Sequence, residues 1–259
     1  MNRCYDLATV DQPALVLAEK QRQGVRVAMI APAYNEGEKI LGVVQRWPRE
    51  MIDELLVVDD HSDDGSMAAV AQAGATVLTS PHQRSVGLTI AHGLLTAKKQ
   101  GFDIAVVIAG NGKDDPGEVH RLLWPILMDG VDYVQGSRYM AGGVHRYTPL
   151  HRRILTRLYP LLVGMITGVW PTEATNGYRA YRLDVIDRAG MDLTQSWLSE
   201  SLEYYIAAKV YLSSLVTAEV PVSKIYPQQA SYASYTKIRP TKLFHRIMPL
   251  LLLRLGIRH

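Results

Sequence analysis

The N-terminal part of the chain alternates short apolar segments with segments of helical spacing, and this alternation constrains the fold more than any other feature of the sequence. The apolar runs at residues 25–30, 54–58, 76–79 and 104–108 are typical of buried strands. Strands that alternate with helices form βαβ units, whose strands lie parallel in one sheet. The sequence therefore predicts an α/β fold with a mostly parallel, Rossmann-like sheet flanked by helices.

The second half of the chain carries two longer helical patterns, at residues 149–167 and 198–212. No internal repeat, low-complexity tract or linker separates it from the first half, so we predict one large domain. The predicted organisation is an N-terminal extension at residues 1–24, the domain at 25–237 and a basic amphipathic tail at 238–259.

The chain has a net charge of only +3, but this charge is unevenly distributed. No acidic residue follows Glu219, whereas seven basic residues do: Lys224, Lys237, Arg239, Lys242, Arg246, Arg254 and Arg258. A basic end suits phosphate groups or an anionic membrane surface, so we expect a peripheral contact with the inner face of a membrane; a solvated basic end is the alternative. We expect no nucleic-acid partner, because neither aromatic interleaving nor a known motif accompanies the charge.

Cysteine content and hydropathy indicate a cytoplasmic protein. The single cysteine, Cys4, excludes an intrachain disulfide framework and a cysteine-rich zinc site, which favours a reducing compartment. The N-terminus has no continuous apolar core of the kind that a secretory signal needs. The longest apolar run, residues 158–170, is interrupted by Pro160 and Gly164 and is shorter than the about 20 residues of a spanning helix. We therefore expect no transmembrane anchor.

Several common sites are excluded by their missing residues. The acidic loop at residues 60–65 lacks the later glutamate of a calcium-binding loop. No Walker sequence or glycine triplet follows the first strand, and no Gly-x-Ser-x-Gly elbow is present. A P-loop enzyme, a dinucleotide-binding enzyme and the usual serine hydrolase are therefore not expected.

Two polar loops follow the first two predicted strands. Residues 31–36 read Ala-Pro-Ala-Tyr-Asn-Glu, and residues 57–66 read Val-Val-Asp-Asp-His-Ser-Asp-Asp-Gly-Ser. In an open parallel sheet, ligands bind beyond the carboxyl ends of the strands, where such loops converge. Taken singly, these residues have the composition of turns and helix caps. Together, and at this spacing, they resemble the family 2 glycosyltransferases, which have the GT-A fold.

The resemblance implies that these loops hold a nucleotide, with a ring packed on the base and a carboxylate accepting hydrogen bonds from base or ribose. The implied nucleotide-binding residues are Pro32, Tyr34, Glu36, Asp60, Arg84, Gly110 and Asn111. The loop at residues 84–87 departs from the family pattern, since it lacks the usual asparagine and double glycine. We interpret Asp59 as a structural residue.

Further segments are similar to one subgroup, the dolichol- and polyprenol-phosphate mannose and glucose synthases. They are the Gly-Ser-Arg-Tyr run at 136–139, the pair Arg152 and Thr156, the segment 175–182 and the segments 219–222 and 235–237. By this resemblance Arg138 and Arg152 are catalytic, because an arginine fork pairs with phosphate oxygens. Thr156, Arg179 and Lys237 would hold the phosphate of the acceptor. A surface ion pair is the alternative for each arginine.

The sequence departs from this family where its members carry an Asp-x-Asp motif that holds Mg²⁺ or Mn²⁺. Residues 109–116 read Ala-Gly-Asn-Gly-Lys-Asp-Asp-Pro, so both expected carboxylates are missing. We favour metal-independent catalysis, with the Lys113 ammonium as a catalytic point charge on the diphosphate. Asn111 and Asp115 are the remaining candidates for a weak metal site, and a solvated Lys113 is the alternative.

The expected activity is inverting transfer of a sugar from a UDP- or GDP-linked donor to a polyprenyl-phosphate or small soluble acceptor. A phosphate acceptor needs no base, whereas a hydroxyl needs a carboxylate to take its proton, for which Glu203 is the candidate catalytic residue, with Glu200 nearby. Carboxylates at a helix N-terminus are also common as mere dipole partners. The alternative functions are a catalytically inactive nucleotide-sugar-binding protein and a nucleotidyltransferase of the same architecture.

Overall fold

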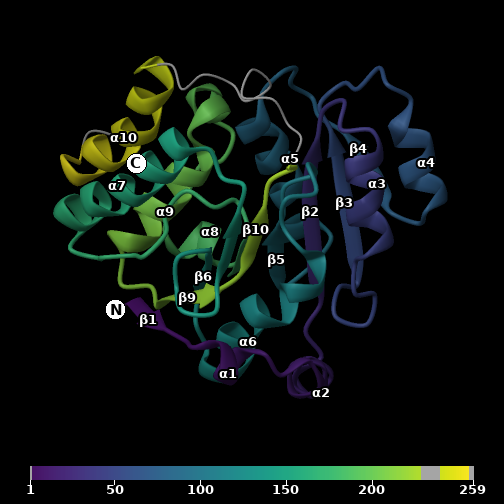
Figure 1. The fold of residues 1–259 in the computed structure, drawn as a ribbon, viewed down its shortest axis with the longest axis horizontal. Helices are drawn as coiled ribbons and strands as arrows, with labels where there is room; N and C mark the ends of the chain where they lie inside the picture. The colour runs from purple at the N-terminus through teal and green to yellow at the C-terminus, as the bar shows by residue number, and fades with distance from the viewer. Residues whose placement is uncertain (1, 229–239, 257–259) are drawn as a thin grey trace.

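The computed structural model describes residues 2–228 and 240–256, which form a central eight-stranded sheet with helices on both faces (Figure 1). The strand order is β1-β9-β6-β8-β5-β2-β3-β4, and β10 and β7 form a separate pair. The strands are β1 (Asn2–Cys4), β2 (Val27–Ala33), β3 (Glu54–Asp59), β4 (Thr76–Thr79), β5 (Ile104–Val107), β6 (Tyr133–Ser137), β7 (Val144–Arg146), β8 (Arg179–Arg182), β9 (Thr217–Pro221) and β10 (Ser223–Ile225).

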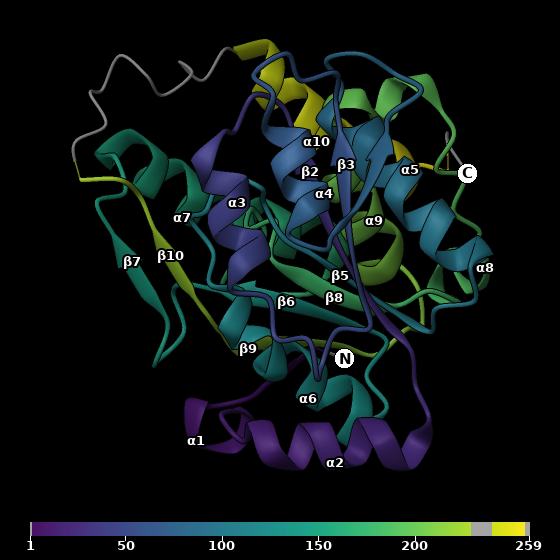
Figure 2. The ribbon, with the colours of Figure 1, turned by 90° about the vertical axis from the view of Figure 1, so that its right-hand side faces the viewer.

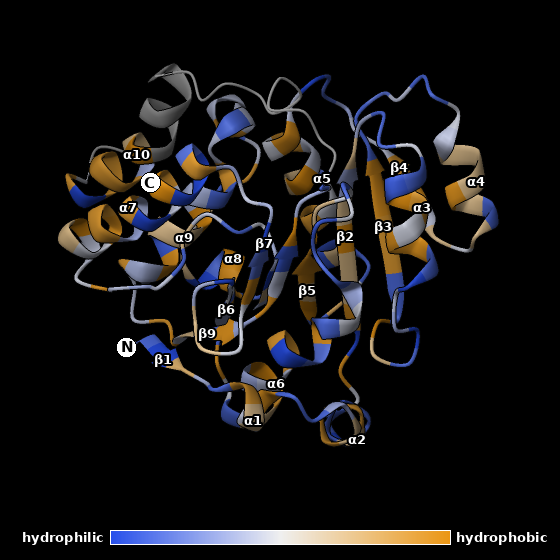
Figure 3. Ribbon diagram, in the orientation of Figure 1, coloured by the Kyte–Doolittle hydropathy of each residue, from blue (hydrophilic) through white to orange (hydrophobic). Residues whose placement is uncertain are grey.

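Helices cover each face of the sheet over its own apolar core. Helices α5, α7, α8, α9 and α10 lie on one core, and α1, α2, α3, α4 and α6 on the other. The helices are α1 (Leu7–Val10), α2 (Pro13–Gln23), α3 (Glu38–Gln45), α4 (Ser66–Gln72), α5 (Val86–Lys99), α6 (Val119–Asp129), α7 (Leu150–Thr167), α8 (Val185–Arg188), α9 (Leu202–Tyr211) and α10 (Pro240–Arg254), with short 3₁₀ turns η1 (Pro116–Glu118) and η2 (Ser196–Glu200). The apolar strands between the two cores are orange in Figure 3.

The predicted parallel sheet is confirmed, with one exception. Strand β8 is antiparallel to both of its neighbours, β5 and β6, whereas the other pairings in the sheet are parallel. The strands are buried on both faces, so they read as continuous apolar runs rather than as alternating ones. The parallel strands β2, β3 and β5 are adjacent, and their carboxyl ends therefore open into one region.

Residues 2–24 belong to the same domain and do not form a separate extension as predicted. Strand β1 pairs with β9 and forms one edge of the sheet. Helix α2 lies against α6 (Figure 2). The side chains of Val10 and Val16 are fully buried in the core beneath. This burial of apolar surface fixes the segment to the sheet.

The C-terminal helix α10 packs against α7 and α9, and Leu250 is buried there. It forms part of the segment that the sequence assigns to a basic tail. The β10–β7 pair is also placed by tertiary contacts, since Asp114 in the loop after β5 forms an isolated bridge with Lys224 of β10. The chain after β9 is thereby brought to the carboxyl end of β5.

Candidate functional site

A pocket of about 270 Å³ lies at the carboxyl ends of β2, β3 and β5, beside the start of α5. Its lining residues are Pro32, Ala33, Tyr34, Glu36, Asp60, Val86, Thr89, Ala109, Gly110 and Asn111. Gly110 allows the loop after β5 to approach β2 closely, because an added Cβ would lie 2.6 Å from the Pro32 carbonyl oxygen. Six of the seven residues expected to bind a nucleotide thus line one pocket.

The carboxylate of Asp60 lies in the wall of this pocket and is only 6% exposed. Its Oδ2 accepts a hydrogen bond from the Ser85 N–H at 2.9 Å, whereas its buried Oδ1 has no partner among the described residues. A buried polar atom without a partner costs free energy, so this oxygen is suited to a donor supplied by a ligand. The neighbouring Asp59 differs, since its Oδ1 accepts from the Ser62 N–H at 2.9 Å and closes the turn.

Arg84, the seventh expected residue, covers the pocket from outside. Its guanidinium carbon lies 4.1 Å from the centre of the Tyr34 ring, in a cation–π contact. The φ angle of Arg84 is +55°, a left-handed conformation that a non-glycine residue seldom adopts. The exposed Arg84 and the ring of Tyr34 therefore form one outer edge of the pocket.

Four basic residues act electrostatically on the buried phenol of Tyr226, which lies just after β10. We name these four residues and Tyr226 the Tyr226 cluster. The four basic residues are Lys113, Arg138, Arg152 and Lys224. The Lys113 Nζ lies 4.8 Å from the centre of the Tyr226 ring. Burial raises the pKa of the Tyr226 phenol, but the four positive charges lower it and prevail, so that its pKa lies below the usual value.

Lys113 links the Tyr226 cluster to the pocket. The pKa of its ammonium is lower than usual, mainly because of burial and also because of the charges of Lys224 and Arg152. Tyr226 and Glu36 of the pocket raise this pKa, but they do not offset the decrease. Its backbone N–H donates to Oδ1 of Asn111 at 3.3 Å, and its carbonyl accepts from the N–H of Ile225. The lysine therefore lies within electrostatic range of both the pocket of about 270 Å³ and the cluster.

Two members of the Tyr226 cluster form buried ion pairs that we did not predict from the sequence. The Lys224 Nζ lies 2.8 and 2.7 Å from the two carboxylate oxygens of Asp114 and 3.0 Å from the Asn176 side-chain oxygen. The Arg138 Nε donates to Glu173 at 2.7 Å, and the side chains of this pair are 2% and 0% exposed. The available signal was a lysine in a short run that is apolar apart from Ser223, as Lys224 is in residues 220–225.

Burial lowers the pKa of Arg138, but Glu173 and the neighbouring Tyr226, Tyr139 and Asp114 raise it above the usual value. This arginine forms a buried wall of the cluster, in contrast to the surface ion pair that was the alternative.

Arg179, which we predicted to hold the acceptor phosphate, donates to backbone carbonyls in this structure. Its Nε and one terminal nitrogen each donate to a backbone carbonyl at 2.7 Å, those of Asn176 and Glu203, and the other donates to that of Ala174 at 3.3 Å. Arg179 is 2% exposed, and its guanidinium links the loop before β8 to the start of α9 through these hydrogen bonds.

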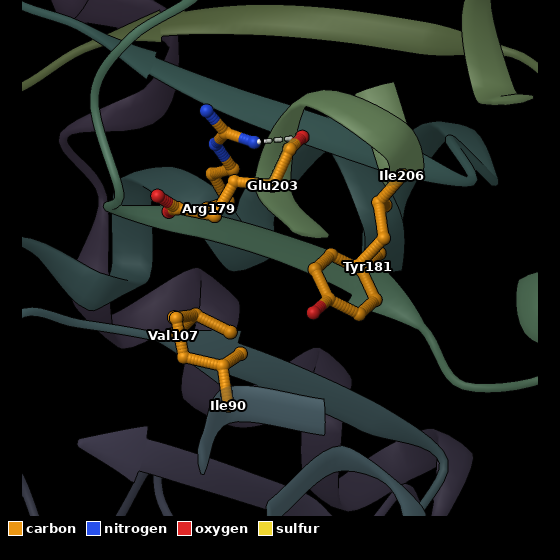
Figure 4. Close-up of a pocket in the computed structure, with 6 residues that line it drawn as sticks. All are labelled: Ile90, Val107, Arg179, Tyr181, Glu203 and Ile206. Atoms are coloured by element: carbon orange, nitrogen blue, oxygen red, sulfur yellow. Dashed lines mark hydrogen bonds between the residues drawn. The ribbon is translucent and has the colours of Figure 1, made fainter. Parts of the chain in front are cut away.

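Glu203, the candidate base for a hydroxyl acceptor, lines a different and much smaller cavity of about 10 Å³ with Arg179, Ile90, Val107, Tyr181 and Ile206 (Figure 4). Such a volume is near the minimum for one water molecule.

The remaining acceptor residues lie on and beside α7. The Thr156 hydroxyl lies 2.6 Å from that of Tyr139 and donates to the Arg152 carbonyl at 2.8 Å. Arg152 is half-buried and contributes to the Tyr226 cluster. Lys237, the third predicted residue, lies outside the described residues.

The residues after β5 do not fit a divalent metal. Asp115 caps η1 by accepting from the Gly117 N–H and pairs with Arg46, so its carboxylate does not join Asn111 in the pocket. Asp114 is bound to Lys224. Across residues 2–228 and 240–256, no three His, Cys, Asp or Glu side chains gather as metal ligands. Hard cations such as Mg²⁺ require oxygen ligands, and these are not assembled here.

Comparison with known proteins identifies the family. The model of glycosyl transferase family 2 matches residues 29–190, more than half of the chain. This chain belongs to glycosyltransferase family 2. The match spans β2 to α8 and includes every residue that lines the pocket of about 270 Å³.

Relatives of this glycosyltransferase use lipid phosphates, as their names state. It is 25% identical to the UDP-N-acetylglucosamine--dolichyl-phosphate N-acetylglucosaminyltransferase of Methanococcus voltae over 89% of this chain and 96% of the relative. It is 30% identical to the undecaprenyl-phosphate mannosyltransferase of Micrococcus luteus over 66% of this chain and 72% of the relative.

Solved structures share the GT-A fold of this glycosyltransferase. Mannosyl-3-phosphoglycerate synthase from Rubrobacter xylanophilus has a TM-score of 0.72 and 20% identity, covering 99% of this chain and 83% of that one. Glucosyl-3-phosphoglycerate synthase from Mycobacterium tuberculosis, in complex with Mn²⁺, uridine diphosphate and phosphoglyceric acid, has a TM-score of 0.66 and 18% identity, covering 96% and 84%. At identities this low, the similarity supports a shared fold and nothing further.

Proposed function

We propose that this protein is an inverting glycosyltransferase that moves a sugar from a nucleoside diphosphate sugar to a phosphate-bearing acceptor. One observation carries the proposal: the buried Oδ1 of Asp60 in the pocket wall has no donor among the described residues. A base N–H or a ribose hydroxyl supplies such a donor. The Tyr226 cluster adjoins this pocket and offers positive charge to the diphosphate.

In the proposed reaction, an oxygen of the acceptor attacks the anomeric carbon opposite the diphosphate. The new carbon–oxygen bond forms as the bond to the diphosphate breaks, and the bonding electrons leave with the diphosphate. The protein contributes chiefly by holding both groups in line and by stabilising the charge of the leaving group. We assign the second task to Lys113, because it lies near both Glu36 of the pocket and Tyr226 of the cluster.

We favour a phosphate oxygen of polyprenyl phosphate as the attacking group. A phosphate is already an anion at neutral pH, so no base is needed, and Glu203 lines a separate small cavity. The lipid-phosphate transferases of Methanococcus voltae and Micrococcus luteus support this choice. Phosphoglycerate, which is named in the titles of the structural neighbours, is the small soluble alternative.

The test is incubation of the purified protein with UDP- and GDP-sugars and either undecaprenyl phosphate or 3-phosphoglycerate. We expect release of nucleoside diphosphate and a glycosylated lipid phosphate. Product formed only with 3-phosphoglycerate would overturn the assigned acceptor. A nucleotidyltransferase would instead form or consume pyrophosphate, and an inactive binding protein would release no diphosphate.

Replacing Asp60 by asparagine is expected to weaken nucleoside diphosphate and nucleotide sugar alike by about 10- to 150-fold, because a hydrogen bond to a charged group is worth about 1.5 to 3 kcal/mol. Titration calorimetry measures both affinities. The control is Asp63→Asn, an exposed carboxylate of the same loop that does not line the pocket. Unchanged diphosphate affinity in a folded Asp60→Asn protein would show that Asp60 does not contact the nucleotide.

Replacing Arg152 by lysine is expected to lower turnover by more than about tenfold, since lysine keeps the charge but loses the planar fork that binds two phosphate oxygens. The adjacent Arg153 is exposed, so Arg153→Lys is the matched control and should retain wild-type turnover. Steady-state kinetics at saturating donor distinguish the two. Near-normal turnover of Arg152→Lys would remove this residue from the phosphate site.

A further inference from the structure

Helix α7 exposes a stripe of large apolar side chains, which we name the α7 stripe. It consists of Leu150, Ile154, Leu158, Leu161 and Met165, which are 58%, 50%, 51%, 51% and 65% exposed. The spacings of four, four, three and four residues place these side chains along one face of the helix. Figure 3 shows α7 at the surface of the molecule with much of its length in orange.

The opposite face of α7 is buried against the protein through Tyr159, Val163 and Gly164. A helix at the surface of a globular protein normally turns polar residues outward. In α7, by contrast, both the buried face and the exposed α7 stripe are apolar. Single exposed apolar residues need no explanation, but a continuous apolar row indicates a binding surface. The α7 stripe is therefore suited to burial against another apolar phase.

Basic residues and aromatic rings flank the α7 stripe. Helix α7 contains no aspartate or glutamate, and the exposed His151 and Arg153 lie beside the stripe. Tyr147 and Trp170, before and after the helix, are 54% and 61% exposed. An apolar face with basic flanks and aromatic residues at its ends has the composition of a helix at a membrane interface.

Charge distinguishes a bilayer from a second copy of the chain as the partner. In a two-fold dimer, one surface meets itself, so the basic flank of α7 would face the same cations across the interface. Anionic lipid headgroups instead complement these cations. In the part of the chain that the structure describes, no helix has the length and apolar content to cross a bilayer, so contact at the surface is the relevant mode.

We propose that the α7 stripe docks this protein onto an anionic membrane surface, and that α7 thereby presents the acceptor to the active site. The second clause rests on the proposed function, because Arg152 and Thr156, assigned to the acceptor phosphate, project from the same helix toward Tyr139 and the Tyr226 cluster. A lipid phosphate would then pass from the bilayer to the reaction centre around a single helix. The proposed contact surface lies on α7, whereas the charge distribution indicates the tail at residues 238–259.

Co-sedimentation with vesicles tests the docking without any acceptor. The full chain is mixed with vesicles of phosphatidylcholine alone or with equal parts of phosphatidylglycerol. The combined variant Ile154→Gln, Leu158→Gln and Met165→Gln is expected to lower the partition coefficient by at least about a hundred-fold, because each residue loses most of its burial in lipid. The control Leu15→Gln changes a residue of α2 that is 53% exposed and should bind as the wild type does.

The basic flank is tested separately. Arg153→Gln is expected to lower binding to the phosphatidylglycerol vesicles by about five-fold and to leave binding to phosphatidylcholine unchanged. Arg22→Gln, an exposed charge on α2, is the matched control. Equal sedimentation of the combined stripe variant and the wild type would overturn the proposal, as would a wild-type dimer that the stripe variant dissociates in ultracentrifugation without vesicle binding.

A pair of transfer assays distinguishes failure of the docking from failure of the proposed function. The stripe variant should keep wild-type transfer to a short-chain, water-soluble prenyl phosphate and lose transfer to undecaprenyl phosphate in vesicles. Equal loss with both acceptors would show that the stripe acts inside the active site, which contradicts docking. Vesicle binding by a wild type that transfers to neither acceptor would refute the proposed function and leave the docking intact.

Discussion

Replacing Lys113 by alanine is expected to lower kcat/KM by about 10²- to 10³-fold, the usual effect of removing one group that stabilises charge developing in a transition state. The wild type is expected to remain active in excess EDTA, because the loop after β5 offers Lys113 and Asn111 in place of a set of carboxylate ligands. Product formation by both proteins, with and without chelator, is the measurement. The control Lys99→Ala removes an exposed lysine at the end of α5 and should have no effect.

The pH dependence provides a second readout for Lys113. Burial lowers the pKa of its ammonium in the folded protein, so the charged form is complete at low pH and is lost as pH rises through this lowered pKa. We therefore expect kcat/KM to decline on the alkaline side below the ordinary lysine pKa of 10.5, and Lys113→Arg to shift the decline to higher pH. Tyr226→Phe is the necessary control, because the pKa of this phenol is also lowered.

Loss of wild-type turnover in EDTA, restored by Mg²⁺ or Mn²⁺, would refute metal independence. The complex of the Mycobacterium tuberculosis structural neighbour contains Mn²⁺ with uridine diphosphate, so this outcome has a precedent in the fold. It would direct attention to Asn111 and Asp115 as ligands. The second of these would first have to leave the N-terminus of η1 and its pairing with Arg46.

Replacing Arg138 by methionine is expected to lower the free energy of unfolding by about 3 to 5 kcal/mol, because it leaves the carboxylate of Glu173 buried without its counter-charge. The double variant Arg138→Met and Glu173→Gln should recover most of this loss, since both charges are then absent and the amide oxygen can still accept from Thr175. Urea unfolding of the wild type, the single variants Arg138→Met and Glu173→Gln, and the double variant measures the coupling free energy between the two side chains.

An exposed ion pair provides the comparison for Arg138. Lys98 and Asp187 have side chains that are 33% and 70% exposed, so Lys98→Met should cost only about 0 to 1 kcal/mol. A similar small cost for Arg138→Met would mean that water reaches Glu173. In that case the cluster would be more open than its burial indicates, and Arg138 itself could contact the substrate phosphate.

The pocket of about 270 Å³ was the part of the candidate site most accessible to prediction. Pro32 lies at the end of β2, and Tyr34 and Asp60 directly follow β2 and β3, whose apolar character is plain in the sequence. Parallel neighbours place their carboxyl ends together. The unpartnered Oδ1 of Asp60 could not be predicted, because it depends on which oxygen the Ser85 N–H occupies. Local pattern therefore located the pocket, and the fold determined which atom is available to a ligand.

Arg179 has surroundings that the sequence did not predict. It lies in a segment that resembles a phosphate-binding element, yet its guanidinium donates to the carbonyls of Ala174, Asn176 and Glu203. The Asn176 and Ala174 carbonyls lie three and five residues before Arg179, whereas the Glu203 carbonyl comes from α9. The sequence shows only that an arginine is present, whether it binds phosphate or closes a loop. Only the groups around its guanidinium distinguish the two roles.

Short-range hydropathy and the residues of single loops were sufficient to predict the mostly parallel α/β sheet and the family, and they indicated loop residues that gather at one pocket. The tertiary structure alone decided the Tyr226 cluster and the α7 stripe. Lys224 reaches Asp114 across 110 positions of the chain, and no local pattern encodes a contact at that separation. Likewise, apolar residues of α7 occur on more than one of its faces in the sequence, and only its packing through Tyr159 and Val163 determines which of them remain exposed.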